Sequence, residues 1–188
     1  MDELYRRLDS LVEKMSTKDF QENKGLGNEV GYYVFDYPEQ LELEVREWVF
    51  RQQQKKNSNY TLKVFNLFDI LLDLLKEEDI LQDTFDLEKE EGMRELIDAI
   101  GDLVEITEVN NYFVRRIKQN IELGDIVYIT GVGEIFPLIR SHKVLNTMNL
   151  SLDNVPIVMF FPGKYDGVSL NIFHEVLDDN YYRAFRIV

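Results

Sequence analysis

Residues 130–142, TGVGEIFPLIRSH, are the part of the sequence whose types and spacing come closest to ligand chemistry. They follow the apolar run DIVYI, and a strand that ends in Gly-x-Gly before a helix often presents backbone N–H groups to a phosphate. Here Glu134 follows the second glycine, where a Walker loop would continue to lysine and a hydroxyl residue, and Phe136 stands where a dinucleotide fingerprint needs a third glycine. A carboxylate beside the turn repels phosphate. The pattern therefore favours a tight strand-to-helix turn at Gly131 and Gly133, with a bound nucleotide as the less favoured alternative.

Other polar residues follow the predicted strands. Because ligands in open parallel sheets bind at the carboxyl ends of the strands, we expect the polar groups at these ends to converge. They are Asp36, Glu134, Lys164 and Asp166. Asp69 also follows a strand, but the first turn of a helix favours a carboxylate in any case.

A metal or covalent site has little support in the residue types. Asp36, Glu134 and Asp166 offer hard oxygen ligands for Mg²⁺, but their spacing does not force them together and no histidine cluster supports them. There is no cysteine and no G-x-S-x-G elbow. Ser141 and His142 are adjacent on a predicted helix, where they diverge by about 100°. We expect no catalytic residue, no metal, no cofactor and no enzymatic activity.

Composition restricts the class of protein. The chain has 188 residues, of which 45% are hydrophobic, enough for one globular domain over residues 1–188. The net charge of −14 repels phosphates, so direct DNA binding by the isolated chain is not expected. The absence of cysteine, of a membrane-spanning apolar stretch and of a signal-peptide pattern at the N-terminus predicts a cytoplasmic protein.

The elements that would position these residues alternate between strands and helices. Strands are predicted at residues 32–37, 60–67, 125–130 and 155–161 and within the final nine residues. Helices are predicted over residues 2–15, after Pro38, from 68 to about 81, through most of 83–123, and from the quoted turn to about 149; residues 16–31 are predicted to form a loop. The alternation predicts a three-layer α/β fold with a mainly parallel sheet of about five strands and helices on both faces, Rossmann-like or similar to a degenerate NTPase.

Tyrosine and arginine gather in two segments, and both types often anchor protein interfaces. One segment carries Tyr32, Tyr33 and Tyr37, and the other carries Tyr181, Tyr182, Arg183 and Arg186. One of the two is predicted to be an interface, although half of these tyrosines could equally pack inside. Tyr182 and Arg183, with Lys164 and Asp166, are the candidate contact residues.

Four long segments follow one another along nearly the whole chain: ENKGLGNEVGYYVFDYP, TGVGEIFPLIRSH followed by LN, VMFFPGKYDGVSL and DDNYYRAFR. Together, and in this order, they resemble the BrxB family of BREX bacteriophage-exclusion systems. The resemblance implies antiviral defence in a bacterium or archaeon. It also implies an alkaline-phosphatase-like partner called PglZ and, in the same systems, a large ATPase and an adenine-specific DNA methyltransferase. The family has no established catalytic residues to carry over.

Three functions remain open from the sequence. The favoured one is a non-enzymatic assembly subunit that docks PglZ through a surface rich in tyrosine and arginine. The alternative is an enzyme or sensor that binds a nucleotide or metal in the crevice at the carboxyl ends of the strands. The third is a degenerate NTPase-like fold that keeps this crevice only as a docking groove, which the sequence does not separate from the first.

Overall fold

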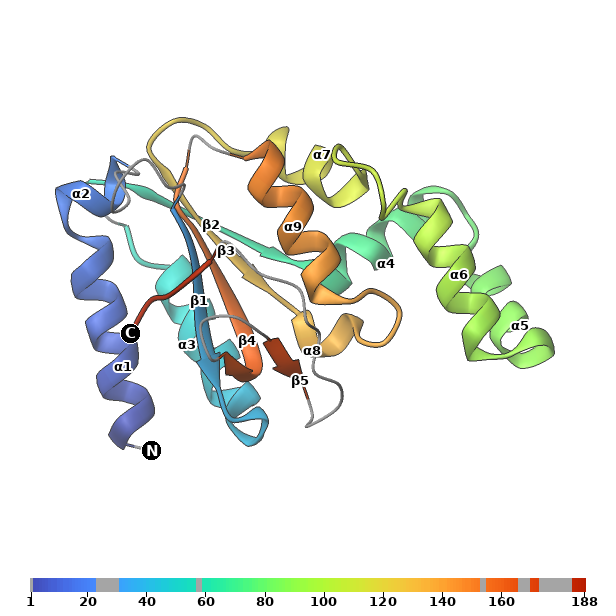
Figure 1. Cartoon of the computed structure of the whole chain (residues 1–188), viewed down its shortest axis with the longest axis horizontal. Coiled ribbons are helices and arrows are strands. Elements are labelled where there is room, and N and C mark those ends of the chain that lie inside the picture. The colour runs from blue at the N-terminus through green and yellow to red at the C-terminus, as the bar shows by residue number, and fades with distance from the viewer. Residues whose placement is uncertain (1, 23–30, 57–58, 153–154, 166–169, 173–183) are drawn as a thin grey trace.

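A computed structural model describes residues 2–22, 31–56, 59–152, 155–165, 170–172 and 184–188. Its central sheet has five parallel strands in the order β2-β3-β4-β1-β6 (Figure 1). These strands are β1 (Tyr32–Tyr37), β2 (Thr61–Asn66), β3 (Asp125–Thr130), β4 (Ile157–Tyr165) and β6 (Phe185–Arg186). A further strand, β5 (Leu170–Ile172), pairs antiparallel with the end of β4. The predicted fold class is confirmed.

The helices cover both faces of this sheet because the chain crosses it in two directions. From β1 the chain passes to β2 at one edge, and from β2 it returns through β3 to β4, so right-handed crossovers place the connecting helices on opposite faces. One face carries α1 (Asp2–Met15), α2 (Lys18–Gln21), η1 (Glu39–Leu41) and α3 (Glu42–Gln53). The other carries α4 (Leu67–Glu77), α6 (Met93–Leu103), α7 (Tyr112–Lys118), α8 (Val132–Ile135) and α9 (Ser141–Ser151).

Strand residues alternate between the two hydrophobic clusters that these layers enclose. On β4, Ile157, Met159 and Phe161 pack with α4, α7 and α9, whereas Val158 and Phe160 pack with α1 and α3. A sheet covered on both faces needs apolar residues at every position, which explains the uninterrupted run at residues 155–161. The apolar residues of the strands, which are visible in the sequence, therefore form the centre of both hydrophobic clusters.

Three local predictions were wrong. The helix expected from the quoted turn to residue 149 is two helices, because Phe136 is extended ahead of Pro137 and proline cannot continue a helical hydrogen-bond ladder. The expected loop at 16–31 contains α2, which Thr17 caps by accepting the backbone N–H of Phe20. Strand β4 also runs to Tyr165, since β5 pairs with its last three residues.

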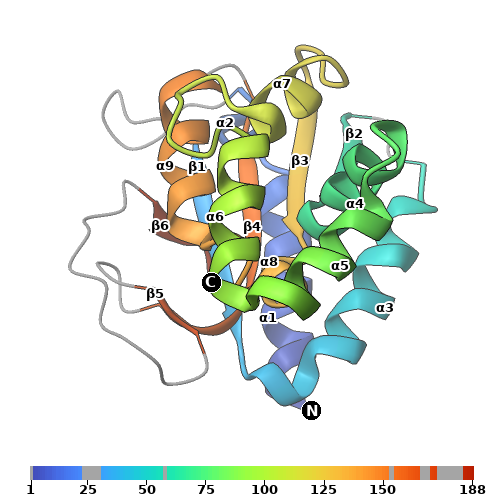
Figure 2. The same ribbon diagram turned by 90° about the vertical axis from the view of Figure 1, so that its right-hand side faces the viewer.

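Helix α5 (Leu81–Glu91) and α6 form a hairpin that extends from the body at the right of Figure 1. Viewed from that side, the two helices stand in front of the sheet (Figure 2). Helix α5 contains no buried residue, whereas α6 buries Leu96 and Ile100 against the core. Both helices attach the hairpin to the body, since Leu81 and Leu87 of α5 are partly buried against the same core.

Candidate functional site at the carboxyl edge of the sheet

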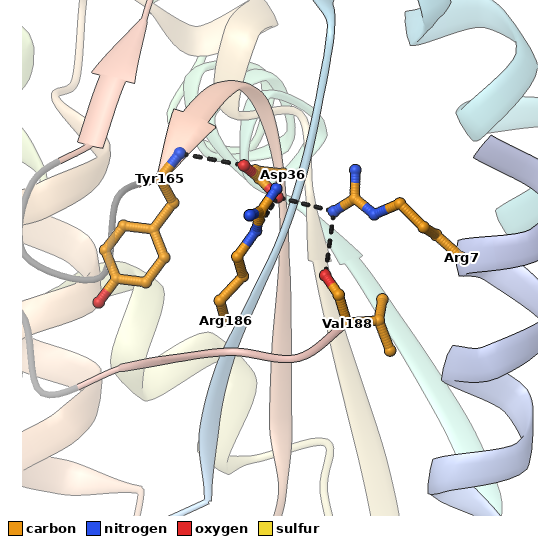
Figure 3. Close-up of polar contacts among 5 residues, drawn as sticks. All are labelled: Arg7, Asp36, Tyr165, Arg186 and Val188. Carbon is orange, nitrogen blue, oxygen red and sulfur yellow. Dashed lines mark hydrogen bonds and ion pairs between the residues drawn. The ribbon is translucent and has the colours of Figure 1, made fainter. Parts of the chain in front are cut away.

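Asp36, near the end of β1, is a buried carboxylate whose two oxygens are both engaged within the chain (Figure 3). Its Oδ1 accepts from Arg7 Nη2 at 2.7 Å and from Arg186 Nε at 2.9 Å. Its Oδ2 accepts the backbone N–H of Tyr165 at 3.2 Å. Arg7 also donates to the carbonyl oxygen of Val188 at 3.3 Å. One side chain thereby ties together α1, β1, β4 and the segment that contains β6.

This cluster lies where an open sheet would normally bind a ligand. Strands β1 and β4 are neighbours, but β1 leads to β2 on one side and β4 is followed by β6 on the other, which makes their carboxyl ends the topological switch point. Beyond this point β4 continues to Tyr165, which is 1% exposed and donates its hydroxyl to the carbonyl oxygen of Ala184 at 2.7 Å. The chain's own groups therefore occupy the space around Asp36.

Gly131 begins the turn after β3, and its conformation is one that glycine favours, with φ +74°. A Cβ atom at this position would lie 2.0 Å from Asn66 Oδ1, so no larger residue fits while that side chain keeps its place. Asn66 Oδ1 accepts the backbone N–H groups of Phe68 at 2.8 Å and Asp69 at 3.2 Å, which caps α4. The glycine is thus explained by the close approach to a capping side chain, without a phosphate.

A second polar network surrounds Glu134 at the same edge. Glu134 accepts a hydrogen bond from Asn66 Nδ2 at 2.8 Å and forms an ion pair with Arg46 of α3. Nearby, Tyr37 donates its hydroxyl to Glu42 Oε2 at 2.6 Å. Burial, reinforced by the negative charges of Glu42 and Glu134, raises the pKa of Tyr37 far above its ordinary value. Tyr37 therefore keeps its proton and donates it in the hydrogen bond to Glu42.

The structure describes some of the remaining candidate residues and not others. Asp36 and Glu134 have no hydrogen-bonding or ion-pairing partner in common among the described residues, so each carboxylate is engaged by its own set of groups. Gly133 lies within α8, and Lys164 is exposed on β4 opposite Asn171 of β5. Asp166, Tyr182 and Arg183 lie outside the described residues. Among the described residues, no three of the types His, Cys, Asp and Glu lie close enough together to hold a metal ion.

The first tyrosine cluster belongs mainly to the core. Tyr32 is fully buried and its hydroxyl contacts the carbonyl oxygens of Met148 and Leu152, while Tyr37 is 3% exposed. Tyr33 is half-buried and stacks on Phe20 with ring centroids 4.9 Å apart. Of the two alternatives left open for these tyrosines, the packed one applies to Tyr32 and Tyr37.

Several residues that build this edge did not stand out in the sequence. Asn66 directly precedes the apolar helix LFDILL and carried a recognisable helix-cap signal. Arg7 and Arg46 lie on predicted helices without any local sign that they would reach Asp36 and Glu134, because those contacts span 29 and 88 residues. Only the tertiary fold reveals such partners.

Comparison with known proteins gives the family. The family model described as BREX protein BrxB matches residues 63–187, which is more than half of the chain. The chain belongs to the BrxB family. A BrxB protein of Bacillus cereus (strain H3081.97) is 42% identical over 190 residues, which cover 100% of this chain and 99% of that protein. A BrxB protein of Escherichia coli O9:H4 (strain HS) is 29% identical over 182 residues, which cover 97% of this chain and 90% of that protein.

Membership of the BrxB family supports a role in the BREX anti-phage system. No solved structure matches the chain. Within the described part of the chain, none of the helices combines the length and the apolar character needed to cross a membrane.

Proposed function

We propose that this BrxB-family protein is a non-enzymatic assembly subunit that docks the alkaline-phosphatase-like PglZ component of its BREX system. The observation that supports the proposal is that the carboxylates at the carboxyl edge of the sheet are hydrogen-bonded and ion-paired within the chain. Asp36 binds two arginines and a backbone N–H, and Glu134 binds Arg46 and Asn66. Residues committed to internal contacts are poorly placed for chemistry, which leaves the protein surface as the working part of the molecule.

The test is size-exclusion chromatography of the purified protein alone and with PglZ from its own operon. Co-elution as a stoichiometric complex is expected. Separate elution of two folded proteins would refute direct docking. Lys164→Glu then asks whether the exposed end of β4 takes part, with Lys55→Glu as a matched charge reversal at an exposed residue just after α3. If both variants co-elute as the wild type does, Lys164 is not a contact residue.

Thermal melting with ligands tests the enzyme or sensor alternative. A ligand present at 100 times its Kd stabilises the folded state by about 2.7 kcal/mol, which in a chain of this size raises Tm by roughly 5–10 °C. The proposal expects no shift with ATP, GTP, NAD or cyclic dinucleotides, with or without Mg²⁺. A shift that disappears in the Asp36→Asn or Glu134→Gln variant, each still folded, would favour a ligand site at the carboxyl edge instead.

A further inference from the structure

A groove separates the α5–α6 hairpin from the body of the protein. Its volume is about 780 Å³. One wall is formed by α6 and the residues that follow it, and the other by the segment that joins α8 to α9. In Figure 1 that joining segment extends from α8 toward α6. Ile97, Ile106, Leu138 and Ile139 give the groove apolar surface, with Ile97 and Leu138 only half-buried. This groove is distinct from the carboxyl edge described above.

The two walls of the groove carry opposite charges. On the hairpin side, Asp98 and Asp102 are exposed one helical turn apart, followed by Glu108. On the body side, the exposed residues are Arg140 and Lys143. Among the described residues no ion pair joins these two walls, and none of these five side chains takes part in an ion pair. Each wall therefore presents charges that an occupant of the groove could pair.

Most of the protein's net negative charge lies on this hairpin together with the residues that flank it. Residues 77–108 contain thirteen acidic and two basic residues, a net charge of −11 out of −14 for the whole chain. Like charges one helical turn apart, as at Asp98 and Asp102, destabilise a helix. A cationic partner relieves that repulsion when it binds, and its attraction to the hairpin also speeds its approach.

We propose that the groove binds an amphipathic segment of a partner protein, with lysine or arginine along the edge that meets α6. Its apolar face would contact Ile97 and Leu138, and acidic residues on its other edge would meet Arg140 and Lys143. Nucleic acid is disfavoured because the carboxylates repel phosphates. A groove whose rims are exposed and charged on both sides also differs from the enclosed, mostly apolar pockets that hold small molecules. The inference rests on the proposed docking role and names the surface that carries it.

Two matched double variants test the groove in the full-length protein. Asp98→Asn with Asp102→Asn removes two charges from the groove wall. Asp9→Asn with Glu13→Gln removes two charges with the same i,i+4 spacing from the exposed face of α1. Affinity for PglZ is measured by titration calorimetry at low and high salt, and circular dichroism verifies folding. Ile97→Ser is a third variant that changes the apolar surface without changing charge.

The groove variant is expected to bind PglZ about tenfold more weakly or worse, with a smaller salt dependence, whereas the α1 variant stays within about twofold of wild type. Ile97→Ser is expected to weaken binding at both salt concentrations equally. If wild type binds PglZ and all variants bind as tightly, the groove inference is overturned while the docking role stands.

If wild type does not bind PglZ, the proposed function fails and the groove is tested with a synthetic probe. The probe is an amphipathic helix of about eleven residues, the length of α6, with a leucine face, one lysine edge and one glutamate edge. Fluorescence anisotropy that shows weaker binding to the Asp98/Asp102 variant than to the α1 variant supports the groove. Absence of binding to wild type, or equal binding to both variants, overturns it.

Discussion

Replacing Gly131 with alanine is the most direct test of how the carboxyl edge is built. Gly131 has φ +74°, and a left-handed conformation costs a residue with a Cβ atom about 1–2 kcal/mol. The new Cβ would also lie 2.0 Å from Asn66 Oδ1, so the asparagine must leave its place. Displacing it breaks the α4 cap, which contributes about 1 kcal/mol, and the 2.8 Å hydrogen bond to Glu134. The combined loss in the free energy of unfolding is about 2–4 kcal/mol.

Urea denaturation followed by circular dichroism measures this loss, and Gly124→Ala is the matched control. Gly124 also has positive φ, +95°, but no atom lies within 4 Å of the position of its added Cβ. Gly124→Ala therefore reports the backbone cost alone, about 1–2 kcal/mol. In a chain of this size, each kcal/mol corresponds to roughly 2–4 °C in Tm, so Gly131→Ala is expected to melt several degrees below the control.

A double-mutant cycle with Asn66→Ala separates the two contributions to the cost at Gly131. With the asparagine side chain already removed, the collision disappears, and Gly131→Ala is expected to cost no more than Gly124→Ala. Two results would refute the reasoning. One is a Gly131→Ala variant as stable as Gly124→Ala in the wild-type background. The other is a cost that is undiminished when Asn66 is alanine.

Three further predictions concern charge. Asp36→Asn weakens contacts to two arginines whose side chains are 21% and 49% exposed, so urea denaturation should show a loss of about 1–3 kcal/mol in the free energy of unfolding, which is below the full cost of breaking a buried pair. The control Asp69→Asn, at an exposed residue, should change the free energy of unfolding by less than about 1 kcal/mol, and equal effects of the two substitutions would contradict a structural role for Asp36. Because the pKa of Tyr37 is raised in the folded state, its contribution to stability is complete below the ordinary tyrosine pKa and declines as pH rises above about 10. Tyr37→Phe should therefore reduce the slope of the free energy of unfolding against pH in this alkaline range by up to about 1.4 kcal/mol per pH unit, and an unchanged slope would refute the raised pKa of Tyr37. Salt should raise the Tm of the wild type because it screens the repulsion among the acidic residues of the hairpin, and at low salt the Asp98→Asn, Asp102→Asn variant should be more stable than wild type by about 0.2–0.5 kcal/mol. A variant that is less stable than wild type at low salt would count against repulsion between these two residues.

The sequence was sufficient for the layered fold because strand and helix signals are local. The aromatic and β-branched run at Tyr32–Tyr37 and the apolar run at 155–161 form neighbouring parallel strands in the core. The departure from the phosphate-binding motifs at Glu134 could also be recognised from the sequence, since these motifs depend only on residue types at fixed spacing. Local patterns failed where one residue interrupts them, as Pro137 does between α8 and α9.

Only the tertiary structure shows which carboxylates form hydrogen bonds or ion pairs, and with which residues. Asp36 and Glu134 both follow predicted strands, and nothing in their neighbourhood distinguishes a catalytic carboxylate from one that holds the fold together. Their partners Arg7 and Arg46 come from helices 29 and 88 residues away. The pairing depends on the strand order β2-β3-β4-β1-β6 and on which face each helix covers.

The charge of the chain shows the same division. The sequence determined that residues 77–108 carry a net charge of −11, because charge is a property of composition. Only the folded chain sets Asp98 and Asp102 across a groove from Arg140 and Lys143, since helix packing fixes that approach. Composition thus gave the sign of the charge around the hairpin, and tertiary packing gave the surface on which that charge is displayed.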